Sequence, residues 1–444
     1  MKLLIKNADL ANLDDLSTKT VDILIEDGRF KQIGENIECD CETIDAHNML
    51  ALPGFVDCHC HMPQSFMKGP LDDMPITDWL VKLFKIEAVM DNETYETATL
   101  LGCLESLRFG TTCINEMGNK NHIDDQIKAI KDSGIRATYS VDTTDIPENE
   151  LTPILTIDEA LAIHQEVYDK ANNNGLMKAA VGPAGLPAVS AELAKACKKF
   201  AREHNIIYHT HLGEGQYETN NVAKRFGLNG EAEALYELGV LDEHTLLAHS
   251  IWLSDSELDL IKRTGAIPVH CPCTNLKISD GVPKIAQMLS RGIKVCFGCD
   301  GEASSSNRDM IREARLGAYL QKGVTLDPVT MDAATVLKMM TVNGAKALGY
   351  DDLGEIKEGY LADMILVDMD NDIGLTDKQH RVSNLLYCGD GHNVDTTIVN
   401  GEVKVRNGKL VGVDEKAFID KCNELITKLN EKVEKLWNIK AQNF

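Results

Sequence analysis

The sequence predicts an α/β protein: a (β/α)8 TIM-like barrel with a small β-sandwich formed by the N- and C-terminal segments. Three observations support this fold class. Through the middle of the chain, apolar runs alternate with amphipathic segments at the spacing of βα units. Both ends of the chain contain short strands joined by tight turns. A chain of 444 residues is long enough for one large barrel and a second, smaller unit.

The two ends of the chain are predicted to fold together. Asp27-Gly28 near the N-terminus and Asn400-Gly401 near the C-terminus each separate two apolar runs, which is typical of a β-hairpin. The N-terminal strands are too few to close a core alone. We therefore expect residues 1–53 and 353–412 to form the β-sandwich, with the barrel, residues 54–352, inserted between them.

Eight candidate strands in the middle segment match the number in a (β/α)8 barrel. They end at His61, Glu116, Asp142, Gly182, His211, His249, His270 and Asp300. Helices are predicted between them at residues 93–109, 121–133, 191–204, 255–264 and 282–291. Residues 413–444 place apolar side chains at steps of three and four, which predicts a C-terminal helix packed outside the barrel.

Composition indicates the class of protein. With 69 acidic and 45 basic residues the net charge is −24, which repels nucleic acid and anionic membranes and favours a protein that handles small molecules. No apolar run approaches the ~20 residues that span a bilayer, and the N-terminus does not read as a signal peptide. We therefore expect a cytoplasmic protein whose 13 cysteines are reduced thiols, several of them small core residues.

Pairs of histidines occur at the ends of two predicted strands. Residues two apart in a strand point to the same side, so His59 and His61 form a chelating pair. The same holds for His209 and His211, and alternation alone does not choose between them. We favour His211 because it is nearer the strand end and is followed by Glu214, and we place His209 in a lower layer of the barrel.

The C-terminal ends of the strands of such a barrel meet at one mouth, so the strand-end residues His59, His61, His209, His211, His249, His270 and Asp300 are all candidates to converge there, with His59, His61, His211 and Asp300 as the favoured set. Each histidine alone also fits a strand cap or a hydrogen-bonded core residue; the convergence favours metal binding. Three imidazoles and a carboxylate suit one divalent ion, with Zn²⁺ as the first choice and Fe²⁺ or Mn²⁺ as alternatives. Such an ion lowers the pKa of bound water from 15.7 toward about 7.

Two further side chains at this mouth are predicted to move protons. Glu214 follows His211 closely, and His249 ends the apolar run at residues 246–248. A carboxyl group can deliver a proton to a ring nitrogen, and an imidazole can orient hydroxide or stabilise the attacked centre. A solvated loop carboxylate and a core histidine are the alternative readings of the same two residues.

A series of motifs covers almost the whole chain. They are Pro53-Gly54-Phe55-Val56-Asp57-Cys58-His59-Cys60-His61, residues 71–80, Phe109-Gly110-Thr111-Thr112, His211-Leu212-Gly213-Glu214, Leu247-Ala248-His249, His270-Cys271-Pro272-Cys273-Thr274-Asn275-Leu276-Lys277 and Gly298-Cys299-Asp300-Gly301. In this order the chain resembles the amidohydrolase superfamily, and within it the branch that includes adenosylhomocysteine/methylthioadenosine deaminases, guanine deaminase and triazine hydrolases. The resemblance implies one metal ion bound by His59, His61, His211 and Asp300, with catalytic roles for Glu214, His249 and Asp300.

The chain departs from the family pattern at the end of the fourth barrel strand. Members that act on nucleosides typically read Gly-Pro-His-Ala-Pro-Tyr there, whereas residues 182–187 read Gly-Pro-Ala-Gly-Leu-Pro, so Ala184 replaces a substrate-contacting histidine. The loss of this hydrogen-bonding group argues against adenosine-type substrates. Trp79 and Asp73 are expected to line the substrate pocket, with Trp79 facing a planar heterocycle; ordinary loop packing explains them equally well.

We therefore predict a metal-dependent hydrolytic deaminase, an amidohydrolase acting on C–N bonds, that releases ammonia from a purine-, pterin- or pyrimidine-like heterocycle. Asp300 takes the proton of the attacking water, Glu214 protonates the ring nitrogen and His249 steadies the intermediate. One alternative is a hydrolase that removes another leaving group from a triazine-like ring or opens a cyclic amide. Another is a non-catalytic binding protein on the same fold. We expect no nucleic-acid or membrane partner, and a homo-oligomer, dimer or larger.

Overall fold

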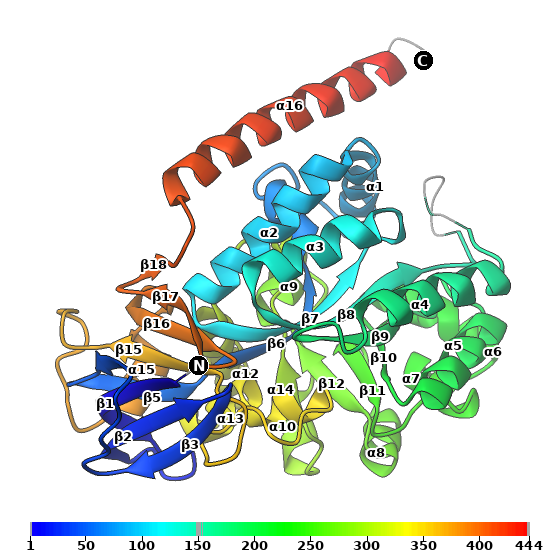
Figure 1. The fold of residues 1–444 in the computed structure, drawn as a ribbon. Helices are drawn as coiled ribbons and strands as arrows, with labels where there is room; N and C mark the ends of the chain where they lie inside the picture. The colour runs from blue at the N-terminus through cyan, green and yellow to red at the C-terminus, as the bar shows by residue number, and fades with distance from the viewer. Residues whose placement is uncertain (1, 148–151, 153, 442–444) are drawn as a thin grey trace.

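The computed structural model describes residues 2–147, 152 and 154–441, and its centre is a closed barrel of eight parallel strands (Figure 1). The strands are β6 (Phe55–His61), β7 (Thr111–Gly118), β8 (Arg136–Thr143), β9 (Met177–Pro183), β10 (Ile207–Leu212), β11 (Thr245–His249), β12 (Ile267–His270) and an eighth strand split into β13 (Cys296–Phe297) and β14 (Asp300–Gly301). β13 pairs with β12 and β14 pairs with β6, so the sheet closes on itself. The predicted fold class is confirmed.

The break in the eighth strand has a steric cause. A Cβ atom at Gly298 would lie 2.9 Å from the Cβ of His59, so the backbone can approach β6 this closely only at a glycine. The chain then turns through Asp300, which has a φ of +62°. The strand ends agree with the sequence to within two residues; β6, β11 and β12 end at His61, His249 and His270 as predicted.

Helices follow the barrel strands and cover the outside of the sheet (Figure 1). They are η1 (Met62–Met67), α1 (Ile76–Glu87), α2 (Asn92–Arg108), η2 (Lys120–His122), α3 (Ile123–Ser133), α4 (Ile157–Ala171), α5 (Ala191–His204), α6 (Gln216–Phe226), α7 (Glu231–Glu237), α8 (Asp255–Thr264), α9 (Pro272–Lys277), α10 (Ile285–Ser290), α11 (Glu302–Ser305), α12 (Met310–Thr325), α13 (Ala333–Met340) and α14 (Val342–Ala347). α5 and α8 have the predicted bounds. In α8 a capping box between Ser254 and Glu257 starts the helix, and left-handed Gly265 ends it.

Strands from both ends of the chain form one separate mixed sheet. Its members are β1 (Lys2–Ala11), β2 (Thr18–Glu26), β3 (Arg29–Gly34), β4 (Glu42–Asp45), β5 (Met49–Pro53), β15 (Met364–Asp368), β16 (Val394–Val399), β17 (Glu402–Arg406) and β18 (Lys409–Leu410). β15 pairs antiparallel with β5 and thereby joins the two ends. Both predicted hairpin turns have positive φ at their two central residues, 51° and 76° at Asp27-Gly28 and 51° and 77° at Asn400-Gly401.

Two contacts fix this sheet and the C-terminal segment to the barrel. Arg136 at the start of β8 makes two 2.9 Å hydrogen bonds to the carboxylate of Asp363, and both side chains are buried. After α15 (Arg381–Cys388) and η3 (Gly391–Asn393), the chain ends in α16 (Glu415–Ala441), which lies over α1 and α2 outside the barrel (Figure 1). α16 buries Leu425 and Leu429 in the same apolar cluster as Trp79 of α1.

The cysteines differ in part from the expectation of free thiols. Cys39 and Cys41 form a disulfide with a Cα–Cα distance of 5.4 Å, so the prediction is wrong for this pair. Both lie in the segment between β3 and β4, where a short turn brings them within bonding range. The eleven other cysteines are free, and most are buried.

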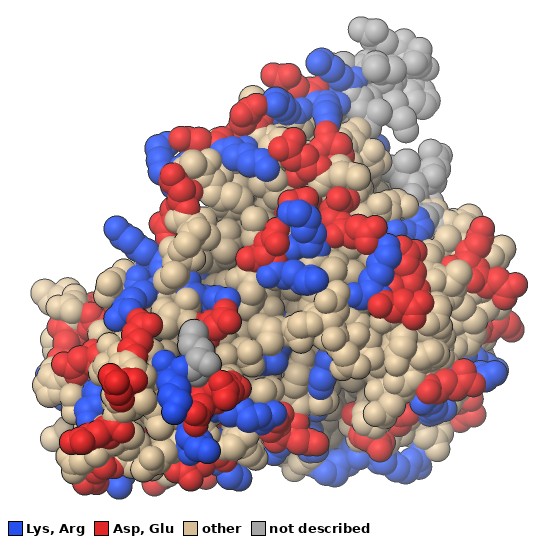
Figure 2. All heavy atoms as spheres, in the orientation of Figure 1, with Lys and Arg blue, Asp and Glu red and all other residues tan. Residues whose placement is uncertain are grey.

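The surface carries the charges of both signs. On the face drawn in Figure 2, acidic and basic side chains alternate over the helices and over the terminal sheet. Among the described residues, no helix combines the length and the apolar character that crossing a membrane requires.

Candidate metal centre and active site

Five ionisable side chains meet at the mouth of the barrel, where strands β6, β10, β11 and β14 end. His59 and His61 belong to β6, His211 to β10, His249 to β11 and Asp300 to β14. Alternation along β6 explains why His59 and His61 share one face. The pairing of Asp300 with Cys60, the residue between them, brings its carboxylate beside both imidazoles.

The spacing of the side-chain atoms fits a metal ion. Asp300 Oδ1 lies 3.3 Å from His59 Nε2 and 3.4 Å from His61 Nε2. Two ligands of one tetrahedral Zn²⁺ are about 3.4 Å apart when each bond to the metal is about 2.1 Å long. The ligand atoms of His59, His61 and His211 lie within 4.8 Å of one another, as do those of His59, His249 and Asp300. This donor set of imidazoles and a carboxylate suits zinc and similar divalent ions.

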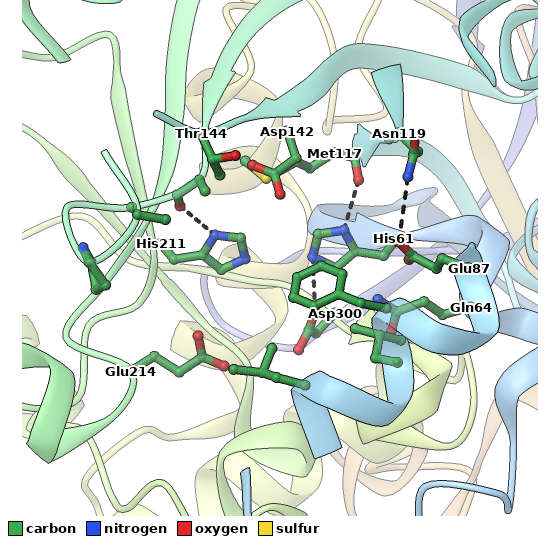
Figure 3. A pocket seen from close by; sticks show the side chains of 18 of the residues that line it. His61, Gln64, Glu87, Met117, Asn119, Asp142, Thr144, His211, Glu214 and Asp300 are labelled. Carbon is green, nitrogen blue, oxygen red and sulfur yellow. Dashed lines mark hydrogen bonds and ion pairs between the residues drawn. The ribbon is translucent and has the colours of Figure 1, made fainter. Parts of the chain in front are cut away.

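All four imidazoles are held from behind through Nδ1, and Figure 3 shows this for His61 and His211. The Nδ1 partners are the Met117 carbonyl for His61 at 2.7 Å, the Ala184 carbonyl for His211 at 2.6 Å, Asn275 Oδ1 for His249 at 2.9 Å and His209 Nε2 for His59 at 3.0 Å. Such contacts fix the ring orientation and tautomer of metal-binding histidines. The buried Nε2 of His59 faces the Asp300 carboxylate, and the buried Nε2 of His249 has no hydrogen-bond partner within the described part of the chain.

The backbone at this site is strained. His249 and Asp300 have φ values of +67° and +62°, a region that non-glycine residues rarely adopt, at a cost on the order of 1–3 kcal/mol each. Arg308, which is fully buried, donates to the Asp300 carbonyl at 2.5 Å and to the His61 carbonyl at 3.3 Å. Its guanidinium also lies 3.2 Å from the buried carboxylate of Glu302. These contacts hold the strained turn and β6 together.

Burial and neighbouring charges set the protonation of the metal-facing groups. Burial lowers the pKa of His61 to about 4 and that of His59 well below its ordinary value, so both imidazoles are neutral near pH 7 and can bind a metal. Burial alone would also lower the pKa of His211, but Glu214 and the Ala184 carbonyl raise it above its ordinary value. Burial alone would raise the pKa of Asp300, but hydrogen bonding to His59 and the neighbouring imidazoles hold it well below the usual range. Asp300 is therefore a carboxylate, as metal binding requires.

A pocket of about 360 Å³ opens above this centre. Trp79 and Ala184, which the sequence placed in the substrate pocket, line it, whereas Asp73 is exposed on the loop before α1 and is not among its lining residues. Glu214 lies on the wall below His211, with Oε1 3.6 Å from His249 Nε2 (Figure 3). The pocket thus places a carboxyl group and an imidazole beside the metal-facing atoms.

Two carboxyl groups in the pocket were not predicted. Glu87 accepts a 3.4 Å hydrogen bond from Asn119, and Asp142 lies beside Met117 and Thr144 (Figure 3). Burial raises the pKa of Glu87 to about 7 and that of Asp142 to about 6. Asp142 ends a predicted strand, and this strand-end position could have indicated that it lies at the mouth. Glu87 ends α1, a helix that was not predicted from the sequence.

His270 also ends a strand but lies outside the site. A Cβ atom at Gly317 of α12 would lie 3.2 Å from His270 Nε2, so the ring is directed toward that helix. Burial lowers the pKa of His270 to about 3. His270 is a buried histidine of the barrel wall.

Comparison with known proteins places the chain in a family. The profile of the amidohydrolase family matches residues 50–404. The chain is 33% identical to the 5-methylthioadenosine/S-adenosylhomocysteine deaminase of Pyrococcus furiosus, over 96% of this chain and 100% of that protein. It is also 33% identical to the 5'-deoxyadenosine deaminase of Methanococcus maripaludis, over 96% of this chain and 99% of that protein.

A solved structure shows the same architecture. An adenosine deaminase from Xanthomonas campestris with bound zinc superposes with a TM-score of 0.91 at 26% identity, over 97% of this chain and 98% of that one. Together with the sequence matches, it confirms the predicted class, a hydrolase that removes an amino group from a nitrogen heterocycle. The chain belongs to the amidohydrolase family.

Proposed function

We propose that this chain is a hydrolytic deaminase of an amino-substituted purine nucleoside or a related heterocycle, dependent on one divalent metal ion held by His59, His61, His211 and Asp300. The observation that carries the proposal is the convergence of these side chains at the floor of the pocket, with ligand atoms spaced as around a single ion. Zn²⁺ is the proposed ion, which the zinc-bound adenosine deaminase relative supports.

The bound ion would supply hydroxide at neutral pH and polarise the attacked carbon. Asp300 remains a carboxylate and has a second oxygen that can accept the proton of the attacking water. Ser304 Oγ donates to Asp300 Oδ2 at 3.1 Å and steadies that oxygen. Asp300 therefore combines metal binding with proton acceptance.

Glu214 and His249 are proposed to act on the other side of the substrate. Glu214 lines the pocket, and its Oε1 is 3.6 Å from His249 Nε2, so a ring nitrogen beside the carboxyl group can receive a proton from it. Asn275 accepts a hydrogen bond from His249 Nδ1 and leaves His249 Nε2 free to contact the oxygen added at the ring carbon. Asp300 then passes the proton it took from water to the amino group, the C–N bond breaks to release ammonia, and the proton of the added hydroxyl returns to Glu214.

The pocket walls suit a flat ring with polar substituents. Trp79 is 6% exposed, lines the pocket and offers an aromatic face. Its Nε1 is buried and has no hydrogen-bond partner among the residues described. Glu87 and Asp142 offer acceptors for hydroxyl or N–H groups. The relatives at 33% identity are named as deaminases of adenosine derivatives, which supports a nucleoside substrate. Ala184 lines the pocket but offers the substrate ring no side-chain hydrogen-bond donor.

Ammonia release tests the proposal. Zinc-loaded protein is assayed with adenosine, 5'-deoxyadenosine, methylthioadenosine, guanine, a pterin, cytosine and an amino-triazine, with ammonia and the oxo product both quantified. We expect one ammonia per oxo product for at least one purine nucleoside, and none after metal removal. Release of chloride or an alkylamine without ammonia would favour the alternative hydrolase, and no turnover of any compound would contradict the proposal.

A homo-oligomeric state and a cytoplasmic location remain predictions of the sequence. Size-exclusion chromatography with light scattering measures the first directly: the predicted dimer has twice the 48.9 kDa mass of one chain.

A further inference from the structure

His209 is a fully buried histidine directly behind the metal centre. It lies in β10, two residues before His211, and its Nε2 is 3.0 Å from Nδ1 of His59, which is also fully buried. The two rings are nearly perpendicular, with an interplanar angle of 81°. His61 and His211 are held by main-chain carbonyls, so His59 is the imidazole of the proposed ligand set whose orienting partner is a side chain.

The contact fixes the position of two protons. A histidine that binds a metal through Nε2 carries its proton on Nδ1. His59 Nδ1 must then donate, and His209 Nε2 must accept, which places the proton of His209 on its own Nδ1. In the opposite arrangement His209 Nε2 donates, and the proton of His59 occupies Nε2, the atom that faces Asp300 at 3.3 Å. Only the first arrangement leaves His59 able to bind a metal.

Packing alone does not explain an imidazole at this position. Layers inside a (β/α)8 barrel are normally filled by branched apolar side chains, which leave no polar atom unsatisfied. His209 Nδ1 is buried and lacks a hydrogen-bond partner in the described ranges of the chain, which is unfavourable for folding. The effect of His209 on His59 therefore explains its presence better than space filling does.

We propose that His209 is a positioning residue that holds His59 as its Nδ1–H tautomer and thereby sets the affinity of the metal centre. The inference rests on the proposed function, because it assumes that His59 binds a metal. His209 is a neutral acceptor, so unlike a carboxylate at the same place it orients His59 without adding negative charge near the metal.

Two substitutions separate the hydrogen bond from the volume of the side chain. In His209→Gln, Oε1 replaces Nε2 as an acceptor, whereas His209→Leu fills similar space without one. His164→Gln is the matched control: His164 is buried and bonded through Nε2 to Thr143 Oγ1 at 3.1 Å, away from the proposed ligands. Zinc affinity is measured by competition with a chromophoric chelator, and the visible spectrum of the cobalt-loaded protein reports the ligand geometry.

We expect His209→Leu to bind zinc about 10- to 100-fold more weakly than the wild type and to change the cobalt spectrum. His209→Gln should remain within about threefold of the wild-type affinity, as should His164→Gln. Equal affinity of His209→Leu and the wild type overturns the inference, and so does an equal loss in both His209 variants. Wild-type protein that binds no zinc overturns the proposed function itself, which distinguishes the two failures.

If His209→Leu does not fold, nitrogen NMR of zinc-loaded wild-type protein with ¹⁵N-labelled histidine gives the answer. We expect a protonated Nδ1 and a metal-bound Nε2 for His59, and an unprotonated Nε2 for His209. A proton on His209 Nε2 overturns the inference.

Discussion

Replacing Glu214 by glutamine tests the proposed acid. Glutamine keeps the shape of the side chain but cannot deliver a proton to a ring nitrogen. General acid–base catalysis typically contributes 10²- to 10⁴-fold, or about 2.7–5.4 kcal/mol of transition-state stabilisation. Because Glu214 lies at the pocket wall, 3.6 Å from His249, we expect kcat/KM to fall by about 10³- to 10⁴-fold.

The metal content of the same variant makes the test specific. The Glu214 carboxylate is outside both groups of clustered ligand atoms, so Glu214→Gln should keep one zinc per chain by elemental analysis. Glu192→Gln, at an exposed position in the first turn of α5, is the matched control and should retain wild-type ammonia release. A variant with more than a tenth of wild-type activity, or one that loses its zinc together with its activity, would refute this role for Glu214.

Three further outcomes follow from other side chains. Asn275→Ala removes the acceptor for His249 Nδ1 and should lower kcat about 10- to 100-fold in steady-state assays; a change confined to KM would contradict its role in orienting His249. Trp79→Ala removes an aromatic wall of the pocket and should raise KM about tenfold with kcat less affected, and an unchanged KM would show that substrate does not contact this ring. Burial lowers the pKa of His164 to about 4, so between pH 6.5 and 4 the unfolded chain binds a proton there that the folded chain does not, and folding stability falls as pH falls. Urea unfolding at pH 7 and 4.5 should show the stability of His164→Gln gaining about 2 kcal/mol on the wild type at the lower pH, whereas an equal difference at both pH values would contradict the depressed pKa.

Much of the site follows from local sequence. Alternation and strand-end position were enough to place His59, His61 and His211 at one mouth, because parallel strands of a barrel present their C-terminal ends on the same side. The same rule failed for His270: its strand ends at the mouth, but the side chain is directed toward α12 at Gly317. His270 has no second histidine two residues before it in the strand, so the sequence pattern does not indicate the direction of its side chain.

Other parts of the site depend on tertiary contacts that sequence patterns do not encode. Arg308 lies eight residues after Asp300, yet it donates to the carbonyls of both Asp300 and His61, which are far apart in the chain. Asn275 belongs to the motif at residues 270–277, but nothing in that motif indicates its 2.9 Å contact with His249. These hydrogen bonds join segments that are far apart in the sequence, so no local pattern predicts them.

Anomalous X-ray diffraction from crystals of the zinc-loaded protein, recorded on both sides of the zinc absorption edge, tests the central claim most directly. We expect one strong peak per chain, about 2.0–2.2 Å from Nε2 of His59, His61 and His211 and from a carboxylate oxygen of Asp300. Stoichiometric zinc at any other position, or no peak between these four side chains, would contradict the proposed metal centre and the chemistry that depends on it.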